Sequence, residues 1–202
     1  CAGALQEVRA ARARGQPIWA ETCVQYLFFT ADDLDRPGFE GAKFVCSPPF
    51  RTPDDQEALW QGLREGTLSV VSTDDCPFTF GTDKARGRED FTKIPNGVPA
   101  IEDRLVVLQH AGVGGGRLSL PRFVEVAATN PAKLFGLYPR KGAIAVGADA
   151  DLVVWDMAQE RVLSARTHHL RVDYNLFEGM RVRGGPAGVW VRGAQVIDGD
   201  RC

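Results

Sequence analysis

One aspartate stands out as a group that could take part in chemistry. Asp74 directly follows the uncharged segment 68–73, which reads LSVVST and is typical of a buried strand. A carboxylate at the end of such a strand needs a partner, because burying a lone charge is costly. The partner would be a metal ion, a base or a helix N-terminus. The alternative is that Asp74 only caps the next loop through backbone N–H groups, and its position alone favours that interpretation.

Two other apolar segments also end in small polar residues. Segment 17–23 ends in ETC, and segment 43–47 ends in CS, where the serine is Ser47. The carboxyl ends of parallel strands face the ligand site in α/β sheets and barrels. We therefore expect these residues and Asp74 to converge on one face.

Histidine and cysteine do not complete a metal centre within this sequence. Of the three histidines, His168 and His169 are adjacent and would point to opposite faces of a strand, and no H-x-H or H-E-x-x-H motif occurs. The five cysteines are widely spaced, odd in number and form no C-x-x-C motif. This usage argues against a disulfide framework or a cysteine zinc site and favours a reducing cytoplasm.

Composition excludes several classes of protein. The 202 residues are 44% hydrophobic and 25% charged, with a net charge of -2, which does not fit a disordered tail, a coiled coil or a basic nucleic-acid binder. Acidic and basic residues nearly cancel, so we expect no nucleic-acid partner. Uncharged runs are too short for a membrane span, so we expect no membrane partner. Six basic residues could form a rim around a site, but we favour a solvated surface and a mobile loop for them: Lys43, Arg51, Lys84, Arg86, Arg88 and Lys93.

The elements that would position these residues change character near residue 138. Periodicity and end signals predict helices over 1–15, 54–65, 99–111 and 120–137, and strands over 17–23, 43–47 and 68–73. This alternation favours parallel strands in βαβ units. Beyond residue 138 we expect an antiparallel sheet of short strands at 144–146, 152–155, 189–191 and 195–197.

Several segments together resemble the dihydropyrimidinase and D-hydantoinase family of cyclic amidohydrolases. They are ETCVQYL (21–27), KFVCSPPFR (43–51), VSTDDCPF (71–78), FTKIPNGVPAIEDR (91–104), ATNPAKLFGLYPRKG (128–142), GADADLVVWD (147–156) and VDYNLFEG (172–179). The resemblance covers essentially the whole chain in order. The chain is thereby identified as the C-terminal half of such an enzyme.

The resemblance implies a fold, a cofactor and a site. The fold is α/β: residues 1–137 would form the C-terminal portion of a metal-dependent (β/α)8 barrel, and residues 138–202 the C-terminal strands of a β-sandwich. Two divalent metal ions, usually zinc, would be held by four histidines and a carboxylated lysine upstream of this chain, together with Asp74. The main-chain groups of Ser47 and Asn96 would hold a cyclic diimide ring. The intact protein would be a homotetramer.

The implied reaction is ring opening of a dihydropyrimidine or hydantoin to an N-carbamoyl amino acid. Metal-activated water would attack the ring amide, and Asp74 would accept the proton of that water and return it to the leaving nitrogen. One departure is Asp75, which replaces the usual histidine of the family and would add negative charge beside Asp74. The alternatives are a non-catalytic dihydropyrimidinase-related protein, or an allantoinase-like or dihydroorotase-like enzyme.

Overall fold

The structure, a computed structural model, describes residues 1–199, so Cys202 lies outside the described residues. The chain divides into two compact units. Unit 1 comprises Cys1–Arg104 and Val162–Met180, and unit 2 comprises Leu105–Arg161 and the residues from Arg181 onward. The two-domain boundary expected near residue 138 concerns the intact protein and stays a prediction.

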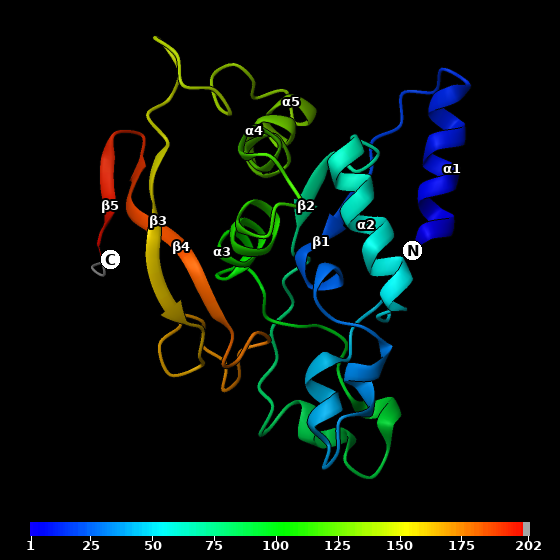
Figure 1. Ribbon diagram of the computed structural model, residues 1–202. Coiled ribbons are helices and arrows are strands. Elements are labelled where there is room, and N and C mark those ends of the chain that lie inside the picture. The colour runs from blue at the N-terminus through cyan, green and yellow to red at the C-terminus, as the bar shows by residue number, and fades with distance from the viewer. Residues whose placement is uncertain (200–202) are drawn as a thin grey trace. The chain divides into compact units, whose positions relative to one another are not determined.

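Unit 1 contains the predicted parallel strands. β1 (Glu21–Cys23) pairs in parallel with β2 (Val70–Ser72), with Thr22 opposite Val71. These strands confirm the predicted segments 17–23 and 68–73, although both are shorter than expected. The helices α1 (Ala2–Ala13) and α2 (Pro53–Glu65) lie next to each other, and α2 runs beside the strands (Figure 1).

Local sequence explains the bounds of α2. The side chain of Thr52 accepts a hydrogen bond from the Asp55 N–H, and Pro53 occupies the first turn. Gly66 ends the helix with a φ of 90°, a left-handed conformation that favours glycine. The buried face of α2 carries Leu59, Trp60 and Leu63. The predicted helix 54–65 is therefore confirmed.

The strand predicted over 43–47 is wrong. Its first residues belong to a 3-10 helix, η3 (Glu40–Phe44), and the chain then continues as an extended segment without strand pairing. β1 pairs directly with β2, so the sheet needs no strand between them. The other short helices of unit 1 are η1 (Val24–Leu27), η2 (Ala31–Asp35), η4 (Lys84–Gly87) and η5 (Phe91–Lys93).

Unit 2 combines short helices with a three-stranded sheet. Its helices are α3 (Arg104–Leu108), η6 (Gln109–Gly114), α4 (Leu120–Val124), η7 (Glu125–Thr129) and α5 (Asn130–Leu134). The sheet has the order β3-β4-β5, formed by β3 (Leu152–Val162), β4 (Arg181–Val191) and β5 (Ala194–Asp198). β4 and β5 are antiparallel, as predicted, whereas no strand forms at 144–146.

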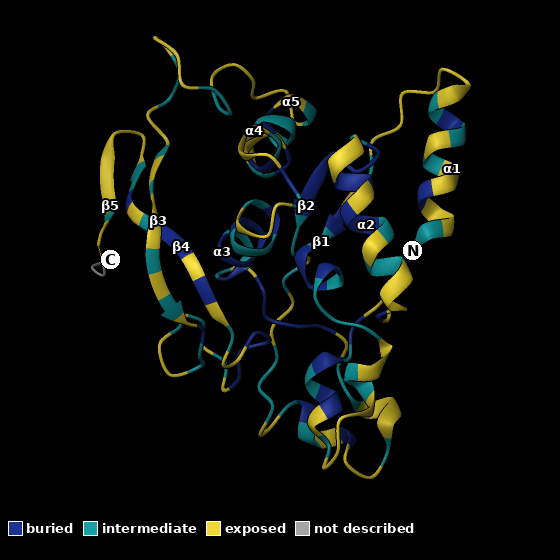
Figure 2. Ribbon diagram, viewed as in Figure 1, coloured by how far each residue is buried: buried dark blue, intermediate teal, exposed yellow. Residues whose placement is uncertain are grey.

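Burial follows the strands of unit 1 and one face of each of its longer helices (Figure 2). Leu63, Val71 and Val98 are completely buried, and so is one cation, Lys84. The placement of Lys84 on a solvated surface is therefore wrong. Within residues 1–199, no helix is both long and apolar enough to cross a membrane.

Candidate functional site

The three predicted site residues of unit 1 are all exposed. Asp74 lies just beyond the carboxyl end of β2, with a left-handed φ of 47°. Ser47 and Asn96 come from segments far apart in the sequence, yet the Ser47 hydroxyl lies 3.5 Å from the Asn96 side-chain oxygen. The structure therefore brings Ser47 and Asn96 together.

The main-chain groups of Ser47 and Asn96 are available to a ligand. Neither the N–H nor the C=O of either residue has a hydrogen-bond partner within the described part of the chain. A cyclic diimide presents alternating carbonyl and N–H groups along one edge. Free main-chain donors and acceptors are complementary to such an edge.

Backbone contacts link the segments that carry Ser47, Asp74 and Asn96. The Gly97 N–H donates to the Val45 carbonyl at 3.0 Å, and the Cys76 N–H donates to the Val98 carbonyl at 3.4 Å. A Cβ atom at Gly97 would lie 2.3 Å from the Cys76 carbonyl oxygen, so this close approach requires glycine. The three segments are thus linked to one another through their backbones.

Two side chains fix the backbone on either side of Asp74. Buried Gln25 donates through Nε2 to the carbonyl of Thr73 at 2.9 Å. The Asp75 carboxylate accepts the N–H groups of Ala100 and Ile101 at 2.7 and 3.0 Å. The capping role that the sequence allowed for Asp74 therefore belongs to Asp75.

Asp74 itself is left available by this arrangement. Its carboxylate has no hydrogen-bond or ion-pair partner among residues 1–199. Its negative charge contributes to the raised pKa of Cys23, although burial is the larger cause. Burial and the same charge also raise the pKa of Cys46, which keeps both thiols protonated near neutral pH.

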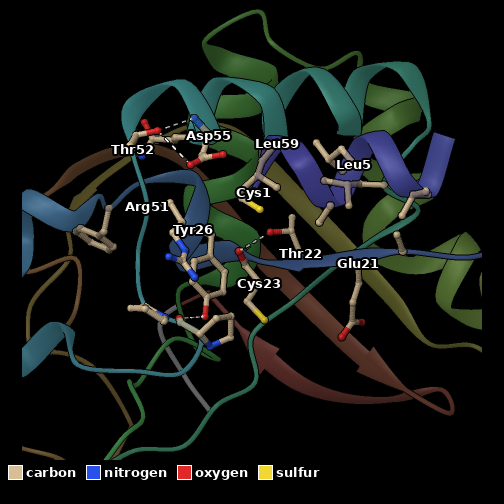
Figure 3. A pocket seen from close by; sticks show the side chains of 18 residues that line it. Cys1, Leu5, Glu21, Thr22, Cys23, Tyr26, Arg51, Thr52, Asp55 and Leu59 are labelled. Atoms are coloured by element: carbon tan, nitrogen blue, oxygen red, sulfur yellow. Dashed lines mark hydrogen bonds between the residues drawn. The ribbon is translucent and has the colours of Figure 1, made fainter. Parts of the chain in front are cut away.

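Tyr26 supports the segment that follows Ser47. Its hydroxyl donates to the Pro48 carbonyl at 2.7 Å, and burial is the main cause of its strongly raised pKa. Tyr26 and Cys23 also line a neighbouring pocket of about 410 Å³ that extends to α1 and α2 (Figure 3). The three predicted site residues do not line this pocket.

Sequence reasoning missed the contacts of Lys84. Its ammonium group donates to the carbonyls of Val45 and Pro95 at 3.1 and 3.2 Å. A single lysine in a polar, glycine-rich loop gave no sign of burial. The structure shows a tightly packed turn here, because a Cβ atom at Gly87 would lie 2.1 Å from the Ile94 side chain, but that packing is not visible in the sequence.

The fit of a divalent metal ion to these residues rests on Asp74. Carboxylate oxygen is a common ligand of zinc and of harder divalent ions. Asp74 offers such a ligand, because its backbone is held on both sides while its carboxylate is unpaired. Within residues 1–199, no group of three or more His, Cys, Asp or Glu side chains is placed to hold a metal. The described residues therefore fit one carboxylate ligand of a larger set.

Comparison with known proteins identifies the family. The sequence model of the amidohydrolase family matches residues 2–196. The chain belongs to the amidohydrolase family. The D-hydantoinase of Geobacillus stearothermophilus is 53% identical over 197 residues, which cover 98% of this chain and 42% of that protein. The predicted resemblance to D-hydantoinases is thus confirmed.

Solved structures of amidohydrolases also match the fold of this chain. D-hydantoinase from Bacillus sp. AR9 gives a TM-score of 0.97 at 51% identity, and dihydropyrimidinase from Brevibacillus agri NCHU1002 gives 0.97 at 49%. Each match covers 100% of this chain and 44% of the solved one. The predicted mixed α/β fold, as part of a hydantoinase chain, is confirmed. The chain spans less than half the length of these relatives.

Proposed function

We propose that the intact protein hydrolyses the cyclic amide bond of dihydropyrimidines and hydantoins. Water adds to a ring carbonyl carbon, the carbon–nitrogen bond breaks, and the nitrogen takes up a proton, which yields an N-carbamoyl amino acid. The observation that carries this proposal is the exposure of Ser47, Asn96 and Asp74 on three segments that share backbone contacts. These segments offer free main-chain donors and acceptors linked through backbone contacts to an unpaired carboxylate.

Ser47 and Asn96 would bind and orient the ring. Their N–H groups would donate to ring carbonyl oxygens, and their C=O groups would accept from the ring N–H. Fixed donors and acceptors reduce the entropic cost of bringing the ring into a reactive geometry. Two similar proteins are named D-hydantoinase and dihydropyrimidinase, and these names support a small cyclic amide as substrate.

Asp74 would move the proton. A carboxylate oxygen of Asp74 would accept a proton from the attacking water and then give it to the leaving nitrogen. Its exposed position and lack of a competing ion pair suit this transfer. Asp74 would also serve as one metal ligand. Bound divalent ions, which we propose to be a zinc pair, would supply Lewis-acid activation.

The test of Asp74 uses the intact protein and the substitution Asp74→Asn. Asparagine removes the carboxylate but tolerates the left-handed backbone at this position, which alanine would strain. We expect turnover of dihydrouracil and hydantoin to fall by about 10²- to 10⁴-fold, the usual contribution of a general acid–base group. Chromatography of the N-carbamoyl product measures the loss.

The matched control for this substitution is Asp54→Asn. Asp54 is an exposed aspartate in the first turn of α2, away from the three linked segments. We expect the control to hydrolyse both rings at the wild-type rate. Wild-type turnover by Asp74→Asn would exclude the proton-transfer role.

Metal analysis and a substrate panel separate the alternatives. A hydrolase should bind about two divalent ions per subunit, lose activity on chelation and regain it when zinc is restored. A non-catalytic dihydropyrimidinase-related protein would show neither turnover nor this dependence. Faster hydrolysis of allantoin or dihydroorotate than of hydantoin would assign the protein to a sister activity.

Three further proposals concern the intact protein. We propose that residues 1–137 belong to a closed (β/α)8 barrel and residues 138–202 to a β-sandwich, which an experimental structure of the intact protein tests. We propose a homotetramer, which light scattering of the purified protein tests. We also propose a reducing cytoplasm, supported by the free thiols of Cys1, Cys23, Cys46 and Cys76, and fractionation of the source cells tests it.

A further inference from the structure

A completely buried lysine lies behind the proposed substrate surface of unit 1. Lys84 has 0% exposed surface, and its ammonium donates to the carbonyls of Val45 and Pro95 at 3.1 and 3.2 Å. No carboxylate pairs with it among residues 1–199. Burying an ammonium is costly unless hydrogen bonds compensate for the lost water. A lysine in this place therefore needs an explanation beyond packing.

The two carbonyls that bind Lys84 belong to the segments carrying Ser47 and Asn96. The Val45 carbonyl also accepts the Gly97 N–H at 3.0 Å, so it joins both segments and the lysine. The Pro95 carbonyl is directly bonded into the proposed binding segment. It belongs to the same peptide group as the Asn96 N–H.

The geometry of that peptide group links the lysine to the surface. The Pro95–Asn96 peptide is not among the cis bonds of the chain, so its C=O and N–H point in opposite directions. Lys84 holds the oxygen from the buried side, and the Asn96 N–H is left free at an exposed residue. A cation on the carbonyl also polarises the peptide and strengthens its N–H as a donor.

The lysine is itself held firmly in place. Its backbone N–H donates to the Thr79 carbonyl at 3.0 Å, and the Asp83 carboxylate accepts the Thr79 N–H at 3.0 Å. Asp173 accepts the N–H groups of Phe80 and Gly81 at 2.5 and 2.8 Å. These contacts fix the turn from which the Lys84 side chain reaches the two carbonyls.

We propose that Lys84 is a positioning residue that orients the Asn96 N–H to donate to a ring carbonyl oxygen of the substrate. This inference rests on the proposed function. Lys84 does not touch the substrate and acts only through the Pro95–Asn96 peptide. Its removal should weaken ring binding in the ground state and the transition state alike, which raises KM and leaves kcat unchanged.

The experiment uses the intact protein with Lys84→Met, which keeps an unbranched side chain but removes the donors. We expect KM for dihydrouracil to rise about 3- to 10-fold, the range for one hydrogen bond, with kcat within about twofold of wild type. Lys84→Gln keeps an amide donor on a shorter side chain and should give an intermediate KM. The matched control is Lys93→Met, an exposed lysine of the same loop, which should leave KM unchanged.

A second measurement does not depend on catalysis. In Lys84→Met, the Gly97 amide should exchange its hydrogen faster, because the lysine that joins the Val45 and Pro95 carbonyls is lost and the contact between their segments opens more often. A merely structural role would lower the active fraction, which reduces kcat and leaves KM unchanged. An unchanged KM in the folded variants would overturn the proposal, and so would failure of both variants to fold.

The outcomes also separate this inference from the proposed function. If wild-type protein hydrolyses none of the rings, the proposed function fails and this inference fails with it. If wild-type protein is active but Lys84→Met keeps its KM and its Gly97 exchange rate, only the inference fails.

Discussion

Neighbouring aspartates after β2 have separate roles because their side chains meet different groups. The Asp75 carboxylate accepts two backbone N–H groups, from Ala100 and Ile101, whereas the Asp74 carboxylate is unpaired within the described chain. Asp75 thereby joins the loop after β2 to the residues that precede α3. The Asp74 carboxylate remains available to a ligand. An aspartate at position 75 is therefore compatible with an ordered loop after β2.

The role of Asp75 predicts a loss of stability when its oxygen is removed. Asp75→Ala should lower the free energy of unfolding of the intact protein by about 1–3 kcal/mol, because two N–H groups lose a charged acceptor. Asp75→Asn keeps an acceptor oxygen and should lose less than half as much. Urea unfolding measures both variants, and equal stability of Asp75→Ala and wild type would contradict the assignment.

Residue types, spacing and the family resemblance pointed to three candidate site residues. Asp74 was found from its place after an uncharged strand, and Ser47 and Asn96 from the family resemblance; their roles stay predictions. Lys84 and Tyr26 were missed because they act through main-chain carbonyls, which a sequence pattern does not reveal. Contacts to backbone depend on how distant segments fold together, not on neighbouring residues.

Among the elements, α2 was predicted well and the segment 43–47 was not. Thr52, Pro53 and Gly66 are local signals that act within one turn of the helix, so the sequence alone determines its ends. Segment 43–47 has the apolar composition of a strand, but its Val45 carbonyl accepts hydrogen bonds from Lys84 and Gly97 and not from a neighbouring strand. Short apolar runs carry no information on which partner satisfies their backbone.

The cap of α2 gives a prediction at the scale of the element. Thr52→Ala should destabilise the intact protein by about 1 kcal/mol, because the Asp55 N–H loses its side-chain acceptor. The loss should extend to α1, since the Asp55 carboxylate also accepts the Ala2 N–H at 2.7 Å. Thr52→Ser keeps the hydroxyl and serves as the control. Urea unfolding that shows no difference between the two variants would contradict this account.

At the scale of the whole molecule, the described residues leave strand edges unpaired and apolar side chains exposed. β1 and β2 pair only with each other among residues 1–199, so each has an edge without a strand partner. In unit 2, Phe135, Ile144 and Val146 are exposed by 78%, 91% and 109%. Open strand edges and exposed apolar side chains favour association with other chains.

These features predict the behaviour of the 202-residue chain expressed alone. It should be insoluble or form oligomers without a cooperative thermal transition, because its apolar surface and strand edges remain uncovered. It should also fail to hydrolyse hydantoin, because Asp74 is only one ligand of the metal pair that we propose for the intact protein. Light scattering, thermal unfolding and product analysis test this, with the intact protein as the control. A monomer that unfolds cooperatively and opens the ring would show that these residues suffice for both folding and catalysis.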